Sequence, residues 1–217
     1  NRPGIRRTDR DLGFSLGDGG QVSFLRLLTA TQLHIRVAEV AATLGWTDDD
    51  IVVNLQGDEP LMPAALLHQV AATLAAHPNA AIATLAAPIT SLEDFLDTNV
   101  VKVVLDDTGR ALYFSRAPIP WTRDAAPGGL MTQTVFDGAR RHLGLYAYRV
   151  GALRRLAAWP PALLEDCEKL EQLRALAHGL EIRVVEAAER PGPDVNSPAD
   201  LPHVEALLVQ NGQQTVK

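Results

Sequence analysis

The chain has 217 residues, of which 47% are hydrophobic and 21% charged, a composition typical of a globular protein with one sizeable core. It contains no run of about 18 apolar residues, so we expect no membrane-spanning helix and no membrane insertion. The formal charge of −6 disfavours nucleic acid as the main partner, and Cys167, the only cysteine, fits a reducing compartment such as the cytoplasm.

The N-terminal part of the chain differs from the rest. Residues 1–20 are rich in arginine, aspartate and glycine and show little periodicity, which predicts loop or poorly ordered chain. Residues 23–44 show apolar side chains at spacings of three and four, which is typical of a helix.

Clearer patterns begin at Ile51. Ile51–Leu55 is a short, β-rich apolar run, as expected for a strand buried on both faces. Pro63 suits the first turn of a helix that ends near His77, and residues 81–87 read as another buried strand. Strand, helix and strand in this order predict a parallel βαβ unit.

The second half of the chain continues to alternate strands and helices. Residues 100–105 and 111–114 flank a polar turn that contains Gly109, which predicts a hairpin. The further predicted elements are a strand at 142–150, a short helix at 151–158, a stronger helix at 165–177, a strand at 182–185 and a last helix opened by Ser197. This alternation predicts an α/β fold.

The residues that follow the first buried strand are Gln56, Gly57, Asp58, Glu59 and Pro60. Ligands of open α/β sheets bind beyond the carboxyl ends of the strands, and a glycine allows the backbone to approach a ligand closely. Asp58 is suited to Mg²⁺, which prefers hard oxygen ligands and bridges to phosphates. From spacing alone, a capped turn leading into a helix explains the same residues.

Six segments, taken in this order, resemble the family of 3-deoxy-manno-octulosonate (Kdo) cytidylyltransferases, also called CMP-Kdo synthetases. They are VVNLQGDEPL at 52–61, ATL with Pro88 at 83–88, NVVKVV at 99–104, ALYFSRAPIPW at 111–121, RHLGLYAYR at 141–149 and LEQLR at 170–174. The similarity extends over about residues 37–208, most of the chain.

This resemblance implies a fold and an activity. The fold is the three-layer, Rossmann-like α/β fold of nucleotide-diphospho-sugar transferases, with a mostly parallel sheet and a β-hairpin subregion for dimerisation and the sugar side. The family couples CTP and Kdo, with Mg²⁺, to give CMP-Kdo and pyrophosphate for lipopolysaccharide synthesis. Members are cytoplasmic homodimers, and the sugar's anomeric hydroxyl attacks the α-phosphorus in line.

The resemblance also implies roles for particular residues. Asp58 is the catalytic, metal-ligating carboxylate, and Gln56 and Gly57 help to place the nucleotide. The residues that match the family's sugar-side motifs are Arg116, His142, Tyr146, Glu171 and Gln172.

Each of these side chains also has a purely structural interpretation. Arg116 could form a surface ion pair, and His142 and Tyr146, at even spacing on one strand, could be core residues. Glu171 and Gln172 could be the wet face of their helix. Two further residues have plain expectations: Lys102 is solvated, and Cys167 is a small apolar residue.

The sequence departs from the family pattern in two places. The family's triphosphate loop, rich in arginine, serine, glycine and lysine, follows a first strand, and a Ser-Gly-Thr-Asp/Glu-Arg motif precedes the helix that begins here near Arg36. We find neither and expect no strand before the basic segment of residues 2–10; Arg36 is interpreted as the remnant of the motif's nucleotide-binding arginine. The second metal-binding aspartate is replaced by Asn196, which keeps a carbonyl ligand, while Asp194 is a possible substitute.

These departures predict two regions and weaker activity. Residues 1–35 form a divergent N-terminal segment, and residues 36–217 a nucleotidyltransferase domain with an incomplete nucleotide half. We expect metal and nucleotide binding to be impaired. Two alternatives stay open: cytidylyl transfer to another acidic sugar such as a sialic acid, and a non-catalytic homologue that dimerises or binds ligand.

Overall fold

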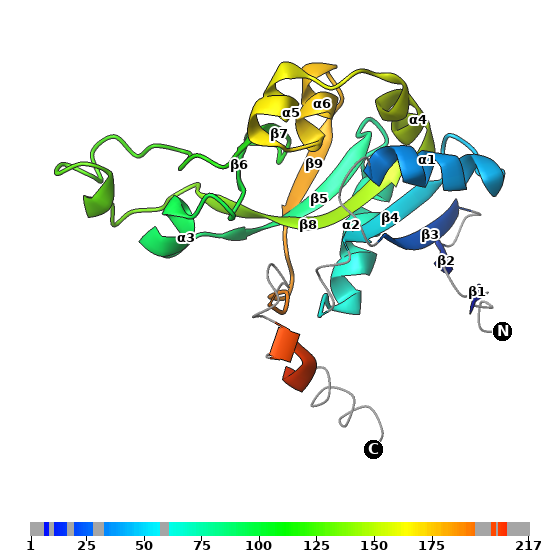
Figure 1. The fold of residues 1–217 in the computed structure, drawn as a ribbon, viewed down its shortest axis with the longest axis horizontal. Coiled ribbons are helices and arrows are strands. Elements are labelled where there is room, and N and C mark those ends of the chain that lie inside the picture. Colours follow the sequence, from blue (N-terminus) through cyan, green and yellow to red (C-terminus); the bar gives the residue numbers. More distant parts are fainter. Residues whose placement is uncertain are drawn as a thin grey trace.

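A computed structural model describes residues 7–8, 11–16, 20–27, 33–56, 61–193, 201–202 and 204–207; before residue 37, and at Gln56, only the backbone is described. These residues build one central sheet (Figure 1). Its strands are β1 (Arg7–Thr8), β2 (Asp11–Leu16), β3 (Gly20–Leu27), β4 (Ile51–Gln56), β5 (Ile82–Pro88), β6 (Lys102–Leu105), β7 (Ala111–Ser115), β8 (Arg140–Arg149) and β9 (Ile182–Glu186).

The strand order is β1-β2-β3-β4-β8-β5-β9, and β6 and β7 extend the sheet beside β8. Strands β3, β4, β5 and β9 run in one direction, and β8 runs antiparallel to its neighbours β4 and β5. The predicted direction of β4 and β5 is therefore confirmed, but they are not adjacent, because β8 lies between them. The order of elements along the chain fixes the direction of a crossover and leaves the neighbours of each strand open.

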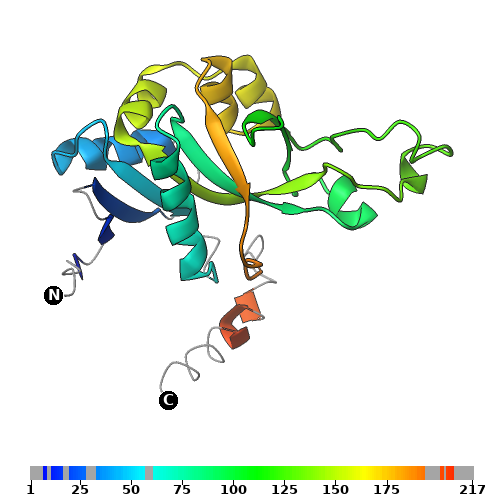
Figure 2. The ribbon, with the colours of Figure 1, turned by 180° about the vertical axis from the view of Figure 1, so that it is seen from behind.

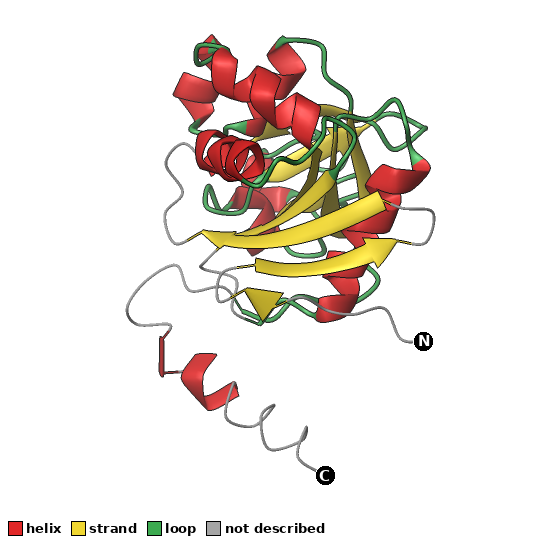
Figure 3. Ribbon diagram, turned by 90° about the vertical axis from the view of Figure 1, so that its right-hand side faces the viewer, coloured by secondary structure: helices red, strands yellow, loops and turns green. Residues whose placement is uncertain are grey.

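Helices lie on both faces of the sheet, which gives three layers (Figure 3). They are α1 (Leu33–Thr43), α2 (Ala64–Ala76), α3 (Leu92–Leu96), α4 (Val150–Ala158), α5 (Leu163–Glu168), α6 (Gln172–Ala177) and the short 3₁₀ helix η1 (Leu130–Thr132). Helix α2 lies on one face of the sheet, seen from behind in Figure 2. It buries Leu66, Val70 and Leu74 in the apolar cluster of that face. Side chains of α1, α4 and α6 pack in a second cluster on the other face.

Three local predictions were wrong. Residues 20–27 form strand β3, so the helix predicted over 23–44 begins only at Leu33, and residues 11–16 form a strand where irregular chain was expected. The helix predicted over 165–177 is divided into α5 and α6, because Lys169 adopts the left-handed conformation with φ of 55° and ends α5. Helix α3 was not predicted; the Ser91 hydroxyl caps it by accepting from the Asp94 amide at 3.1 Å.

The predicted hairpin is confirmed as β6 and β7, with Gly109 at φ of 84° in the turn. Between β7 and β8 the chain projects from the main body as an arm, residues 116–139, next to α3 (Figure 1). A small cluster supports this region, in which the rings of Phe95 and Phe136 meet edge to face at 5.6 Å. Among the described helices, none has both the length and the apolar character needed to cross a membrane.

A buried ion pair fixes the two short helices to each other. The Arg174 guanidinium of α6 donates to both carboxylate oxygens of Glu165 in α5, with Nε 2.7 Å from Oε2. It also donates to the carbonyls of Leu156 and Trp159, so the end of α4 is held by the same group. Both charged side chains are less than a tenth exposed.

We expect Arg174→Met to lower the free energy of unfolding by about 3–5 kcal/mol, because it leaves a buried carboxylate and two carbonyls without this donor. Urea unfolding followed by circular dichroism measures the change. The control is Arg110→Met, which removes an exposed arginine paired with Asp106 and should leave the midpoint unchanged. Equal effects of the two substitutions would show that the buried pair has no special role.

Candidate functional site

The nucleotide half of the predicted site lies mainly outside the described residues. This holds for Gly57, Asp58 and Asn196, and for Gln56 and Arg36 only the backbone is described. The backbone adds to this half a strand that the sequence did not predict. β3 runs parallel to β4, with Leu27 in register opposite Gln56, so both strands end at the same edge of the sheet.

The predicted sugar-side residues of β8 lie together. The rings of His142 and Tyr146 are on the same face of the sheet with centroids 5.1 Å apart, which confirms the prediction from their even spacing. Phe114 of β7 contacts the His142 ring edge to face at 5.1 Å, and Tyr148 stacks on Tyr146 at 5.6 Å. The hairpin and β8 therefore form one aromatic surface of the sheet, which is largely covered: Phe114, Tyr146 and Tyr148 are less than a tenth exposed and pack in the core cluster of this face. Tyr146 is thus a core residue, as its structural interpretation expected, and His142 is half-buried.

Thr84 of β5 determines how the His142 ring is presented. Its hydroxyl donates to the Leu145 carbonyl at 2.8 Å, and its oxygen lies 2.9 Å from His142 Nε2. A hydroxyl has a single proton, so Nε2 must be the donor in the second hydrogen bond. His142 is thus held as the Nε2–H tautomer, and Nδ1 is the acceptor nitrogen of the ring.

Burial keeps both rings uncharged at neutral pH. It lowers the pKa of His142 to about 3. It also raises the pKa of Tyr146 well above its usual value, and the neighbouring Tyr148 and Glu171 raise it further. The site surface therefore offers a hydroxyl donor and an imidazole acceptor, neither of which carries a charge.

The junction between α5 and α6 brings Glu171 and Gln172 to this surface. Glu171 precedes α6, is half-buried, and acts electrostatically on both Tyr146 and Tyr148. Gln172, the first residue of α6, is only 9% exposed. The alternative of a wet helix face is therefore wrong for Gln172, whereas Glu171 is half-buried and lies just before α6.

Arg116 follows β7 and is held by backbone oxygens. Its Nε donates to the Glu168 carbonyl and its Nη1 to the Thr98 carbonyl, both at 2.8 Å. Its own backbone amide donates to the Glu168 carboxylate at 3.0 Å. No described residue accepts a hydrogen bond from its Nη2, which leaves one edge of a fixed cation for a ligand.

Two polar residues near these groups were not assigned to the site from the sequence. Lys102 was expected to be solvated and is fully buried, with Nζ donating to the Asp97 and Val100 carbonyls at 2.8 and 2.7 Å. Asn54 of β4 is fully buried in register opposite Tyr146, and neither amide atom is hydrogen-bonded to a described residue. Both residues are flanked in the sequence by apolar residues, and this pattern did not indicate that their polar side chains are buried near the site. Cys167 is exposed, so the expectation that it packs as an apolar residue was wrong.

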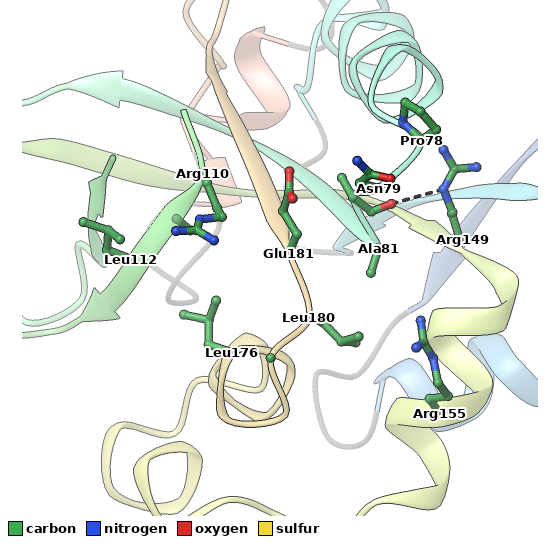
Figure 4. Close-up of a pocket in the computed structure, with 13 residues that line it drawn as sticks. Pro78, Asn79, Ala81, Arg110, Leu112, Arg149, Arg155, Leu176, Leu180 and Glu181 are labelled. Carbon is green, nitrogen blue, oxygen red and sulfur yellow. Dashed lines mark hydrogen bonds between the residues drawn. The ribbon is translucent and has the colours of Figure 1, made fainter. Parts of the chain in front are cut away.

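A cavity of about 570 Å³ lies elsewhere, beside the residues that precede β5 and β9 (Figure 4). Arg110, Arg149 and Arg155 line it together with Glu181. Arg149 donates to the carbonyls of Leu74, His77 and Ala80 and so caps the end of α2, and Glu181 pairs with Arg183. This cavity is at the opposite edge from Gln56 and His142, and Arg110, Arg149 and Glu181 each have a structural partner.

The three-layer α/β fold with its mixed sheet, together with the comparisons with known proteins, defines a nucleotidyltransferase of the cytidylyltransferase class. The family described as "Cytidylyltransferase" matches residues 17–182. A 3-deoxy-manno-octulosonate cytidylyltransferase of Thioalkalivibrio sulfidiphilus is 56% identical over 173 residues, 80% of this chain and 68% of the relative. One of Alkalilimnicola ehrlichii is 56% identical over 177 residues, 82% of this chain and 68% of the relative.

A solved structure agrees with these relatives. CMP:2-keto-3-deoxy-manno-octonic acid synthetase complexed with CTP superposes with a TM-score of 0.70 and 35% identity, over 82% of this chain and 68% of that chain. The chain belongs to the 3-deoxy-manno-octulosonate cytidylyltransferase family.

We expect His142 to remain neutral, as the Nε2–H tautomer, from pH 8 down to about pH 4, because its pKa is about 3 in the folded protein. In the unfolded chain the value is 6.5, so the unfolded state binds one more proton between these two values. The free energy of unfolding should therefore fall as the pH drops from about 6.5 toward about 3, by up to ~1.4 kcal/mol per pH unit.

Long-range ¹H–¹⁵N NMR spectra of the imidazole nitrogens give the tautomer and the titration. His142→Gln should remove this part of the pH dependence of stability. A ring that titrates near pH 6.5 would contradict the buried, threonine-fixed state.

Proposed function

We propose that this chain transfers CMP from CTP to the anomeric hydroxyl of Kdo, which gives CMP-Kdo and pyrophosphate for lipopolysaccharide synthesis in the cytoplasm. The observation that carries the proposal is the 56% identity to curated relatives of that name, over a stretch covering four-fifths of the chain. The chemistry of the aromatic surface on β8 supports the same substrate, because a sugar acid needs both a cation and several uncharged hydrogen-bonding groups.

The described residues suit the acceptor sugar. The free Nη2 edge of Arg116 can receive a carboxylate, and a guanidinium bound to backbone carbonyls is already oriented for that contact. Nδ1 of His142 accepts from a sugar hydroxyl, and the Tyr146 hydroxyl, kept protonated, donates to another. Glu171, which lies at the α5–α6 junction, accepts hydrogen bonds from further hydroxyls of the sugar.

The nucleotide half of the proposal rests on the resemblance. Asp58 and Asn196 would hold Mg²⁺, while Gln56, Gly57 and Arg36 would place the nucleotide. When bound, Mg²⁺ neutralises phosphate charge and orients the triphosphate for in-line attack. The parallel pairing of β3 with β4 supports a frame for this half, since both strands end at the same edge of the sheet, with Leu27 opposite Gln56.

A direct assay tests the activity. The purified chain, CTP, Kdo and MgCl₂ should yield pyrophosphate and CMP-Kdo, followed by ³¹P NMR, and EDTA should stop the reaction. Asp58→Asn should lower kcat/KM by at least about a hundredfold, because a charge-neutralising group at the phosphates is lost. His142→Gln should raise KM for Kdo by about tenfold and leave KM for CTP within about twofold.

Two outcomes would contradict the proposal. Turnover of a sialic acid without turnover of Kdo would assign the chain to another acidic sugar. Absence of turnover, together with no calorimetric heat from millimolar CTP and Mg²⁺, would favour a non-catalytic homologue.

We further propose that the chain forms a homodimer through the arm of residues 116–139. The arm exposes Trp121, Met131 and Val135 at 49%, 72% and 38%. Large apolar side chains gathered on a projecting segment are typical of an interface.

Light scattering after gel filtration should give twice the chain mass of 23.4 kDa. Trp121→Asp should shift the protein toward the monomer. Leu44→Asp is the matched control, because Leu44 is equally exposed at 48% and belongs to the end of α1. A monomeric wild-type chain, or an equal effect of both substitutions, would exclude the arm as the interface.

A further inference from the structure

Four consecutive residues, Asp97 to Val100, lie between α3 and β6 and are bound by two cations. Nζ of Lys102 donates to the carbonyls of Asp97 and Val100 at 2.8 and 2.7 Å. Nη1 of Arg116 donates to the intervening carbonyl of Thr98 at 2.8 Å. The loop of residues 97–100 therefore turns three carbonyls toward positive charge and connects the two side chains.

Lys102 is an unusual group for this position. Its side chain is fully buried, which is rare for lysine, and its Nζ donates to backbone carbonyls. Burial lowers the pKa of its ammonium group, and the nearby carboxylates of Asp97 and Glu168 oppose this shift. An apolar side chain would fill the same space at lower desolvation cost, so the ammonium has a role other than filling the core.

Arg116 is fixed on its other side by Glu168. Arg116 Nε donates to the Glu168 carbonyl, and the Glu168 carboxylate accepts from the Ser115 hydroxyl at 2.6 Å and from the Arg116 amide at 3.0 Å. Burial alone would raise the pKa of Glu168, but these hydrogen bonds outweigh it and hold the pKa below its usual value. The guanidinium is thus held between the end of α5 and the loop of residues 97–100.

Of the two elements that hold Arg116, the end of α5 and the loop of residues 97–100, the loop depends more on Lys102. α5 is fixed by the buried pair of Glu165 and Arg174, whereas the loop has no helix or strand of its own and is held from inside by Lys102. Without the ammonium, the Asp97 carbonyl and the buried Val100 carbonyl would lose a shared donor, and the Thr98 carbonyl between them would move as they turn to other donors. Arg116 would then lose one of its two orienting bonds.

We propose that Lys102 is a positioning residue for sugar binding: it fixes the loop of residues 97–100 so that the free edge of Arg116 is presented to the carboxylate of the acidic sugar. This inference rests on the proposed function of the site. Lys102 does not touch the substrate, and it acts through the Thr98 carbonyl and Arg116.

A double-mutant cycle in the full chain tests the proposal. Lys102→Met should raise KM for Kdo by about tenfold and change KM for CTP by less than about twofold. In an Arg116→Ala background, which itself raises KM for Kdo, the same substitution should add less than about twofold. Lys169→Met is the matched control, because it removes an exposed lysine and should leave both constants unchanged.

A second measurement does not depend on turnover. The Arg116 Nε–H signal in ¹⁵N NMR spectra should be shifted and protected from exchange in the wild type and should move toward the free-arginine position in Lys102→Met. If the methionine variant fails to fold, Lys102→Gln takes its place: its side chain is uncharged and one bond shorter, so it should move both readouts in the same direction by a smaller amount.

Failure of the proposed activity and failure of the positioning role of Lys102 give different results. No CMP-Kdo from the wild type would overturn the proposed function. Wild-type turnover with an unchanged KM for Kdo in Lys102→Met, or with the same fold increase in the Arg116→Ala background, would overturn the positioning role. An Arg116 Nε–H signal that is the same in both proteins would do so as well.

Discussion

The insertion of β8 between β4 and β5 is the constraint on which the site depends. Because β8 is antiparallel to both neighbours, its first residues lie at the edge where β4 and β5 end. Tyr146 pairs with Asn54 on one side and with Thr84 on the other. The irregularity between Thr84 and Leu85 lets the threonine hydroxyl reach two carbonyls of β8 and the ring of His142. A fully regular pairing would leave this hydroxyl without that set of partners.

The neutral and the charged groups around this aromatic surface come from different elements of the fold. The imidazole and the phenol on the sheet are kept neutral by burial, whereas the charges of Arg116 and Glu171 come from a loop and a helix junction that lie over it. Hydrogen bonds in such a low-dielectric place are strong when satisfied and costly when a partner is missing. A sugar that lacks one of the matching hydroxyls would leave a buried donor or acceptor unpaired, which is a stronger basis for selection than the fit of its apolar parts.

The sequence predicted the structure correctly where local periodicity determines the orientation of a side chain or the position of a turn. The even spacing of His142 and Tyr146 placed them on one face, and the polar turn with Gly109 placed the hairpin, because strand geometry and turn conformation are properties of a few adjacent residues. The burial of Lys102 could not be read in this way, since it depends on carbonyls of the preceding loop that turn inward. The end of α5 at Lys169 depends on tertiary packing of α6 against the sheet, and helix propensity alone favours one continuous helix. The strand at 20–27 was missed for a related reason: its pairing with β4 is a long-range contact.

The two substrate halves of the site are connected through the register of β4 and β8. Asn54 lies opposite Tyr146, and the backbone of Gln56 lies two positions further along β4, so one strand pairing relates the position predicted for the nucleotide to a residue predicted for the sugar. A shift of one residue between these strands would turn each side chain to the other face and would also expose Val53 and Leu145, which are fully buried. The apolar cluster under α2, built from Val53, Leu85 and Leu145, therefore fixes the register, and with it the spacing between the end of β4 and the rings of β8. The Asn54 amide, which is hydrogen-bonded to no described residue, lies in the row of Tyr146, so an error of register would displace both side chains.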